Sequence, residues 1–169
     1  MPRRDDLESI MVLGSGPIKI GQAAEFDFSG SQAVRALRED GYKVILVNSN
    51  PATIQNDPEM ADVVYIEPLL PDTIAKILEK ERPCALLAGM GGQTALNIAS
   101  ELSHNGTLER LGVELIGSDL DAIDKAEDRE LFNQVCESIN LPISQAVACN
   151  SIDEVIAAAE LIGSWPILI

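Results

Sequence analysis

Near its N-terminus the chain reads Ile10-Met11-Val12-Leu13-Gly14-Ser15-Gly16-Pro17-Ile18-Lys19-Ile20-Gly21, an apolar run that leads directly into a glycine-rich loop. Such a run, bounded by turn-forming residues, predicts a buried β-strand. Comparable apolar runs recur at 44–47, 63–66, 85–88 and 113–116. Helical patterns lie between them near 29–40, 72–81 and 93–103. This alternation is typical of a parallel sheet with crossover helices, so we predict an α/β fold with an open doubly wound parallel sheet.

The pattern changes after Gly117. Two further helices are expected near 125–139 and 152–162, on either side of a short strand at 143–148. Ser151 and Glu154 form a capping box at the start of the last helix, and Gly163 suits its end. The final residues, 165–169, read as another strand, and we expect the polypeptide to continue beyond it.

The overall charge restricts the possible partners. Lys and Arg total 12 against 27 Asp and Glu, which gives a net charge of −15. An acidic surface of this kind repels nucleic acids and anionic bilayers, so we expect neither as a partner. No apolar run approaches the length of a membrane span.

The cysteines and the histidine argue against redox, metal and histidine chemistry. Cys84, Cys136 and Cys149 are odd in number and lack metal-ligand spacing, which favours reduced thiols in a cytoplasmic protein. His104 is the only histidine and is expected in a surface loop. The glycine loop is also a poor dinucleotide site, because its spacing is G-x-G-x-x-x-x-G and no acidic residue ends the second strand.

Polar segments follow several of the predicted strands, where ligands bind in parallel sheets but where turns also occur. Glu25 and Asp27 precede the first helix, and Asp27 or Ser29 would cap it. The other two segments are 48–53 and 89–94. Glycines before a helix can hold an anion through backbone amides, although tight strand-to-helix packing explains 89–94 equally well. Asp72 is the expected N-cap of the second helix.

The segment from Asp124 to Arg129 carries two cations at the start of a predicted helix. Asp124 and Glu127 would cap it, so Lys125 and Arg129 would share one face near its positive end. The two cations would repel each other and oppose the helix dipole, and a bound anion such as phosphate would relieve this repulsion. Screening by the neighbouring acids is the alternative.

Taken together, these segments resemble one family, the carbamoyl phosphate synthetase large subunit. The matching segments are 16–23, 25–27, 47–53, 57–59, 91–97 and 122–129, in that family's order and approximate spacing. The residues that depart from those most often found in the family are Lys19, Ala24, Gln55-Asn56 and Ala88-Gly89.

The resemblance implies a Rossmann-like pre-ATP-grasp domain over 1–125 and the beginning of an ATP-grasp domain over 126–169. It implies an enzyme that uses two ATP, Mg²⁺ or Mn²⁺, bicarbonate and ammonia to make carbamoyl phosphate for arginine and pyrimidine synthesis. A glutaminase small subunit would supply the ammonia, and this segment would belong to the half that makes carboxyphosphate. The rival families are other ATP-grasp enzymes such as biotin carboxylase, against which the Asn-Pro-Ala-Thr and Gly-Gly-Gln-Thr segments argue. A separate binding module is the rival outside enzymes.

The resemblance also assigns individual residues. Arg129 matches an arginine that contacts the ATP of the first site, while Ala23 and Glu25 match positions along an enclosed route for reaction intermediates. The family's phosphate loop, adenine pocket and metal ligands lie further along its chain. We therefore expect no catalytic or metal-binding residue in this segment, and no activity from the segment alone.

Overall fold

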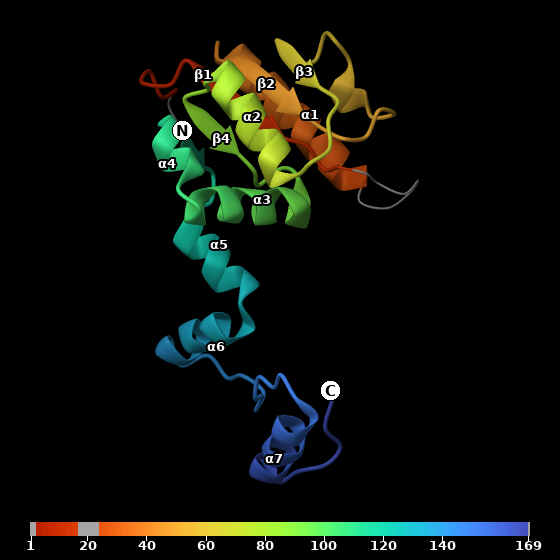
Figure 1. The fold of residues 1–169 in the computed structure, drawn as a ribbon, viewed down its shortest axis with the longest axis vertical. Coiled ribbons are helices and arrows are strands. Elements are labelled where there is room, and N and C mark those ends of the chain that lie inside the picture. The colour runs from red at the N-terminus through yellow and green to blue at the C-terminus, as the bar shows by residue number, and fades with distance from the viewer. Residues whose placement is uncertain (1–2, 17–23, 169) are drawn as a thin grey trace. The chain divides into compact units, whose positions relative to one another are not determined.

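A computed structural model describes residues 3–16 and 24–168 (Figure 1). Contacts within the chain divide it into two compact units, Met1–Ile123 and Asp124–Ile169. The first unit contains a parallel sheet in the strand order β3-β2-β1-β4-β5. Its strands are β1 (Ser9–Leu13), β2 (Lys43–Val47), β3 (Val63–Tyr65), β4 (Ala85–Leu87) and β5 (Glu114–Ile116). Each lies in or overlaps one of the apolar runs, so the predicted doubly wound parallel sheet is confirmed.

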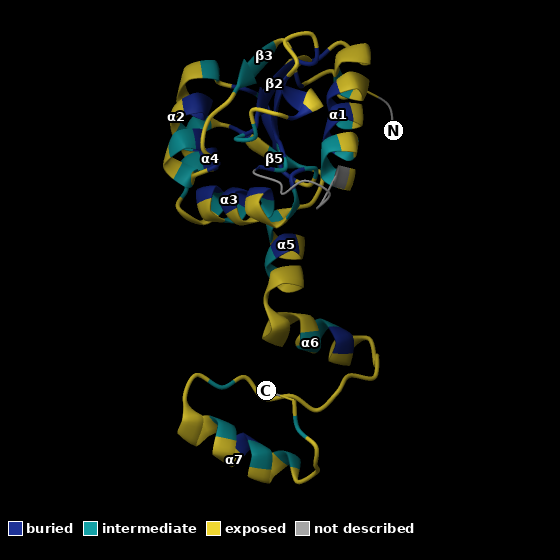
Figure 2. Ribbon diagram, turned by 90° about the vertical axis from the view of Figure 1, so that its right-hand side faces the viewer, coloured by how far each residue is buried: buried dark blue, intermediate teal, exposed yellow. Residues whose placement is uncertain are grey.

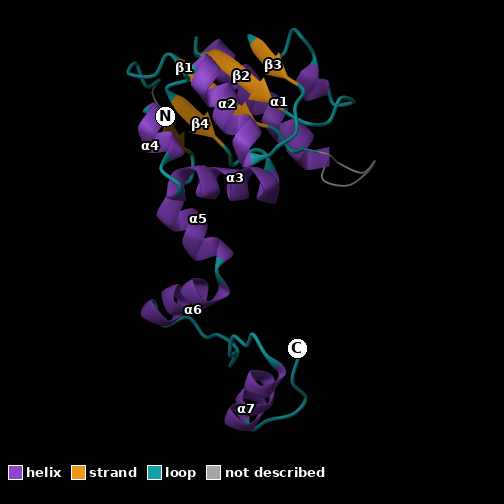
Figure 3. Cartoon of the chain, in the orientation of Figure 1, coloured by secondary structure: helices purple, strands orange, loops and turns teal. Residues whose placement is uncertain are grey.

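Helices cover both faces of this sheet, as Figures 2 and 3 show. The helical elements of the first unit are α1 (Ala24–Glu39), η1 (Ile54–Asn56), α2 (Pro71–Glu81), α3 (Gly92–His104) and α4 (Thr107–Leu111). On β1, Met11 and Leu13 pack in a cluster with residues of α2 and α3, whereas Ile10 and Val12 pack in a second cluster with Val34 of α1. Alternate side chains of one strand therefore serve two separate cores, as the two-residue period of a strand requires.

Several helix starts differ from the prediction. Helix α1 begins at Ala24, and Ser29 is inside it, where its hydroxyl donates to the Phe26 carbonyl oxygen at 3.3 Å. Helix α2 has Leu70 at its N-cap and Pro71 at its first position, so Asp72 is not the cap. Proline is suited to that position because it has no N–H to leave unpaired. His104 is the exposed last residue of α3 rather than part of a loop.

The second unit consists of helices without a sheet among its described residues. Helix α5 (Leu120–Glu127) runs into this unit, and α6 (Arg129–Ser138) and α7 (Ile152–Ile162) follow. The single helix predicted near 125–139 is wrong, because the Asp128 side chain accepts hydrogen bonds from the backbone N–H groups of Glu130 and Leu131, at 2.8 and 2.9 Å, and caps a new helix. The strands predicted at 143–148 and 165–169 are not found within residues 124–168. A strand needs a hydrogen-bonded neighbour, and no described residue of this unit provides one.

The caps of α7 confirm the local signals in part. Ser151 accepts a hydrogen bond from the Glu154 N–H at 3.3 Å, and Gly163 ends the helix at φ 64°. The Glu154 carboxylate, however, accepts from the N–H of Asn150 at 2.7 Å rather than from that of Ser151. None of the helices in the described part of the chain is both long and apolar enough to cross a membrane.

The first prediction concerns Glu81, whose carboxylate accepts a hydrogen bond from the Tyr65 hydroxyl at 2.7 Å and lies 3.3 Å from Lys43 Nζ. The Tyr65 hydrogen bond, followed by that from Lys43, lowers the pKa of the Glu81 carboxyl below its ordinary value of 4.5. A lowered pKa stabilises the fold at pH values above the unfolded pKa, and this contribution is lost as the pH falls through the folded pKa. We expect Glu81→Gln to reduce the free energy of unfolding by about 1 kcal/mol at pH 7, and the difference from wild type to shrink below about pH 4.

Urea unfolding at both pH values measures this difference. Glu79→Gln is the matched control on the same helix, because both side chains of the Glu79–Arg110 ion pair are about half-exposed. The control should change stability by less than about 0.5 kcal/mol. An equal effect of the two substitutions, or one that does not depend on pH, would contradict the prediction.

The second prediction contrasts two glycines of the loop between β4 and α3. A β-carbon added at Gly91 would lie 2.5 Å from the carbonyl oxygen of Gly14 and 2.7 Å from that of Leu13. Both are backbone atoms, so Gly91→Ala should destabilise the fold by about 2 kcal/mol or more. A β-carbon at Gly89 would meet nothing within 4 Å, so Gly89→Ala should leave stability nearly unchanged. The midpoints of urea unfolding compare the two variants.

Candidate functional site

The candidate site lies at the carboxyl edge of the sheet. The polar segments after β1, β2 and β4 converge there, because β1 pairs in parallel with both β2 and β4. The strand order also changes direction between β1 and β4, and such switch points are where open parallel sheets bind ligands. The structure therefore brings the segments beginning at 14, 48 and 88 to one edge of the sheet.

A fully buried amide joins the segment after β2 to α1. The Gln55 side chain is 0% exposed. Its Nε2 donates to the carbonyl oxygens of Phe26 and Asp27, at 3.1 and 3.2 Å, and to Asp27 Oδ1 at 3.3 Å. Its Oε1 accepts from Asn48 Nδ2 at 3.2 Å. This side chain therefore connects the end of β2 to the first turns of α1.

Asp27 is held from a second direction. The Ser15 hydroxyl, in the loop after β1, donates to Asp27 Oδ1 at 3.0 Å. The carboxylate thus accepts hydrogen bonds from side chains of two other segments instead of capping α1. We name the group Ser15, Asp27, Asn48 and Gln55 the edge network. The sequence showed these polar residues, but nothing in the local pattern indicated that Gln55 lies at their centre.

Two glycines make room for the edge network. A β-carbon at Gly14 would lie 2.6 Å from Asn48 Nδ2 and 2.8 Å from Gln55 Oε1, and one at Gly30 would lie 2.6 Å from Gln55 Nε2. The first glycine of the glycine-rich loop is thus required by packing against buried amides. A role in close approach to a ligand is not needed to explain it.

The segment after β2 uses its polar groups within its own turns. Asn48 Oδ1 accepts from the N–H of Asn50 at 3.1 Å, and Asn50 Oδ1 accepts from that of Ala52 at 3.0 Å. Thr53 Oγ1 accepts from the N–H of Gln55 at 3.2 Å and caps η1. These contacts support the turn interpretation of this segment.

Of the two residues predicted for the enclosed route, the structure describes Glu25, which lies at the start of α1. Glu25 is exposed in the first turn of this helix, and the described residues offer its carboxylate no hydrogen bond or ion pair. It is two residues from Asp27 of the edge network. Ala23 lies outside the described residues.

Arg129 and Lys125 are placed differently from the prediction. Lys125 is in the last turn of α5, where a cation is favourable to the helix dipole, and Arg129 is the first residue of α6. Asp124 and Glu127 therefore do not cap a helix that contains both cations, and the predicted repulsion on one face is wrong. Arg129 itself is exposed at the positive end of α6, and no described residue forms an ion pair or hydrogen bond with it.

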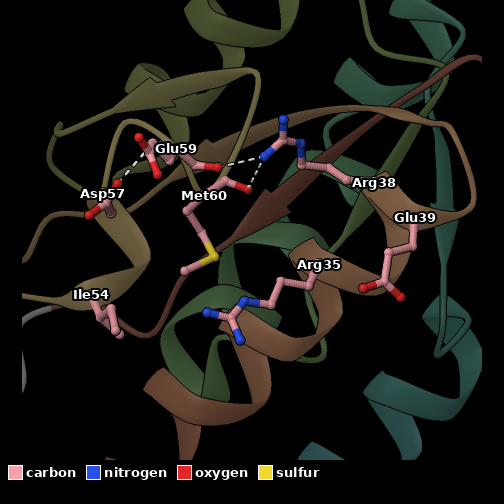
Figure 4. Close-up of a pocket in the computed structure, with 7 residues that line it drawn as sticks. All are labelled: Arg35, Arg38, Glu39, Ile54, Asp57, Glu59 and Met60. Atoms are coloured by element: carbon pink, nitrogen blue, oxygen red, sulfur yellow. Dashed lines mark hydrogen bonds between the residues drawn. The ribbon is translucent and has the colours of Figure 1, made fainter.

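A separate surface pocket of about 680 Å³ lies between α1 and the segment 54–60, and Figure 4 shows its lining. Its lining residues are Arg35, Arg38, Glu39, Ile54, Asp57, Glu59 and Met60. Arg38 donates to the carbonyl oxygens of Glu59 and Met60, which secures this segment to α1. None of the residues predicted for function lines this pocket. The described residues also contain no group of three or more side chains arranged to hold a metal ion.

Comparison with known proteins shows extensive similarity in sequence. A family model described as the carbamoyl phosphate synthase preATP-grasp domain matches residues 6–125. The carbamoyl phosphate synthase large chain of Synechocystis sp. is 58% identical over 169 residues, which are 100% of this chain and 16% of that protein. The N-terminal section of the Aquifex aeolicus large chain is 57% identical over the same length, which is 30% of that protein. This chain therefore spans only a small part of the full-length large chains that it matches.

Solved structures with the same fold are more distant in sequence. The biotin carboxylase domain of the Hydrogenobacter thermophilus 2-oxoglutarate carboxylase, solved with MgADP, ADP and bicarbonate, matches with a TM-score of 0.66 and 16% identity, over 94% of this chain and 34% of that one. The biotin carboxylase domain of a single-chain bacterial carboxylase matches with a TM-score of 0.61 and 13% identity, over 92% of this chain and 34% of that one. These structures share the fold alone, whereas the family model covers most of this sequence, and the chain belongs to the family of carbamoyl phosphate synthase preATP-grasp domains.

Proposed function

We propose that this chain is the N-terminal part of a carbamoyl phosphate synthase large subunit, in the half that makes carboxyphosphate. The observation that carries the proposal is the 57% identity, over all 169 residues, to a protein named as the N-terminal section of that subunit. The biotin carboxylase alternative is supported by fold alone, at 13–16% identity.

The proposed reaction begins when a bicarbonate oxygen attacks the γ-phosphate of ATP, giving carboxyphosphate and ADP. Ammonia from a glutaminase subunit displaces phosphate to give carbamate, and a second ATP in the other half converts carbamate to carbamoyl phosphate. Mg²⁺ or Mn²⁺ would offset the charge of the transferred phosphates, through ligands in the rest of the polypeptide. Carbamoyl phosphate would serve arginine and pyrimidine synthesis in the cytoplasm.

The proposed division of labour follows the two units. Residues 1–125 would form the pre-ATP-grasp domain and 126–169 the beginning of the ATP-grasp domain. The family match over 6–125 and the boundary between the two contact units at 123 and 124 support this division. Arg129 would contact ATP, since its guanidinium is exposed at a helix start and has no partner among the described residues.

An enclosed route is chemically necessary because carboxyphosphate and carbamate decompose in water. We propose that Ala23 and Glu25 line this route. Support comes from the exposed Glu25 carboxylate at the start of α1, which leaves it available to a passing solute or to water. A small residue at position 23 would keep the route open.

The third prediction tests Arg129 in the full-length enzyme. A hydrogen bond between charged groups contributes about 1.5–3 kcal/mol, so Arg129→Ala should reduce bicarbonate-dependent ATP hydrolysis and overall synthesis about tenfold to a hundredfold. ATP formation from carbamoyl phosphate and ADP, which belongs to the other half, should be retained. Arg129→Lys should restore only part of the loss, because a point charge lacks the planar fork of arginine.

Arg110→Ala is the matched control, because Arg110 is another exposed arginine and its ion pair with Glu79 lies in the first unit. It should leave both partial reactions near wild type. If Arg129→Ala lowered both partial reactions equally, or neither, Arg129 would have no specific role in the first ATP site.

The fourth prediction tests the enclosed route. Replacing Ala23 with leucine in the full-length enzyme should largely preserve bicarbonate-dependent ATP hydrolysis while reducing carbamoyl phosphate formation, because the added bulk obstructs transit without touching a phosphate site. The two rates are measured side by side on the same preparation. Equal loss of both would instead indicate overpacking and damage to the fold.

A further inference from the structure

Gln55 carries a polar side chain in a completely buried position. A buried amide is costly unless its donors and acceptor are all used. Here the nitrogen has three acceptors and the oxygen has one donor, at 3.1–3.3 Å.

The acceptors of Gln55 are concentrated on a single helical turn. All three belong to Phe26 or Asp27, in the first turn of α1. The Ser15 hydroxyl donates to the same Oδ1 atom of Asp27 from the loop after β1. Two donors on separate segments therefore fix one carboxylate oxygen, which restricts both the displacement and the rotation of that turn. Apolar packing alone would fill the space without fixing the rotation, since it has no direction.

The edge network is itself anchored to rigid parts of the fold. Asn48, which donates to Gln55, directly follows β2 and is 0% exposed. The backbone N–H of Gly14 donates to the Val47 carbonyl oxygen at 2.8 Å, which ties the loop after β1 to the same strand end. These contacts fix the position of α1 relative to β1 and β2.

We propose that Gln55, together with Ser15, is a positioning residue for Glu25. The pair holds Asp27, and through it the first turn of α1, so that the Glu25 carboxylate keeps a fixed direction. This inference rests on the proposed role of Glu25 in the enclosed route. Positioning of this kind matters because displacements of about 1 Å are enough to impair a functional group.

The experiment uses the full-length enzyme and two independent measurements. Gln55→Met retains the length of the side chain and removes its amide. Amide hydrogen exchange over residues 24–31 should become about tenfold faster relative to α2, the change expected for the loss of one or two hydrogen bonds. The ATP consumed for each carbamoyl phosphate formed should rise at least about twofold, with little change in the rate of bicarbonate-dependent hydrolysis.

Gln32→Met is the matched control, since Gln32 is an exposed glutamine on the same helix. It should change neither measurement. Ser15→Ala removes a single hydrogen bond and should shift both measurements in the same direction by a smaller factor, which provides a second test if Gln55→Met fails to fold.

The outcomes separate this inference from the function on which it rests. Unchanged exchange over 24–31 in the folded variants overturns the inference. The inference is also overturned if Gln55→Met speeds exchange over 24–31 but leaves the ATP consumed for each carbamoyl phosphate at the wild-type value, while Glu25→Gln raises that value. If Glu25→Gln leaves the ratio unchanged, the role of Glu25 in the route is wrong, and the positioning of Glu25 as a functional group is overturned with it.

Discussion

The hydrogen bonds of the Gln55 amide determine how the carboxyl edge of the sheet is assembled. Through them the end of β2 and the first turn of α1 share one buried polar group, and the loop after β1 reaches the same turn through the hydrogen bond from Ser15 to Asp27. Because an unsatisfied buried amide would cost about 1–3 kcal/mol, each of these segments is constrained to the position that completes the set. Gly14 and Gly30 are glycine because the amides occupy the space that a β-carbon would need.

The sheet supplies the rigid frame for this edge. The side chains of β1 alternate between two hydrophobic clusters. A shift of the strand register by one residue would therefore move every side chain of β1 into the opposite cluster. Parallel pairing then aligns the ends of β1, β2 and β4, which places their polar loops together. The charged residues proposed for function lie at this edge or in the second unit, while the frame itself is apolar.

The second unit is organised by local signals. Asp128 and Ser151 each cap a helix through backbone N–H groups three or fewer residues away, and Gly163 ends α7 in the left-handed conformation. Its buried apolar side chains are only Cys136 and Ala158 among the described residues, whereas Ile152, Leu161 and Trp165 are more than three-quarters exposed. Helices with side-chain caps can be recognised from the sequence even where few apolar side chains are buried, because the hydrogen bonds of the caps are local.

The sequence by itself determined the α/β class, the five strands of the sheet, the family and the Ser151 and Gly163 caps of α7, because these depend on residues close together in the chain or on motifs in fixed order. The tertiary structure alone decided that Gln55 occupies the centre of the edge network, since its partners are 28 or 29 residues away along the chain, apart from Asn48. It also decided that 143–148 is not a strand. The cap at Asp128, which divides the helix predicted near 125–139, rests on local hydrogen bonds that the sequence prediction missed. A strand requires a neighbour, and a buried amide requires partners, so neither can be settled by the local pattern.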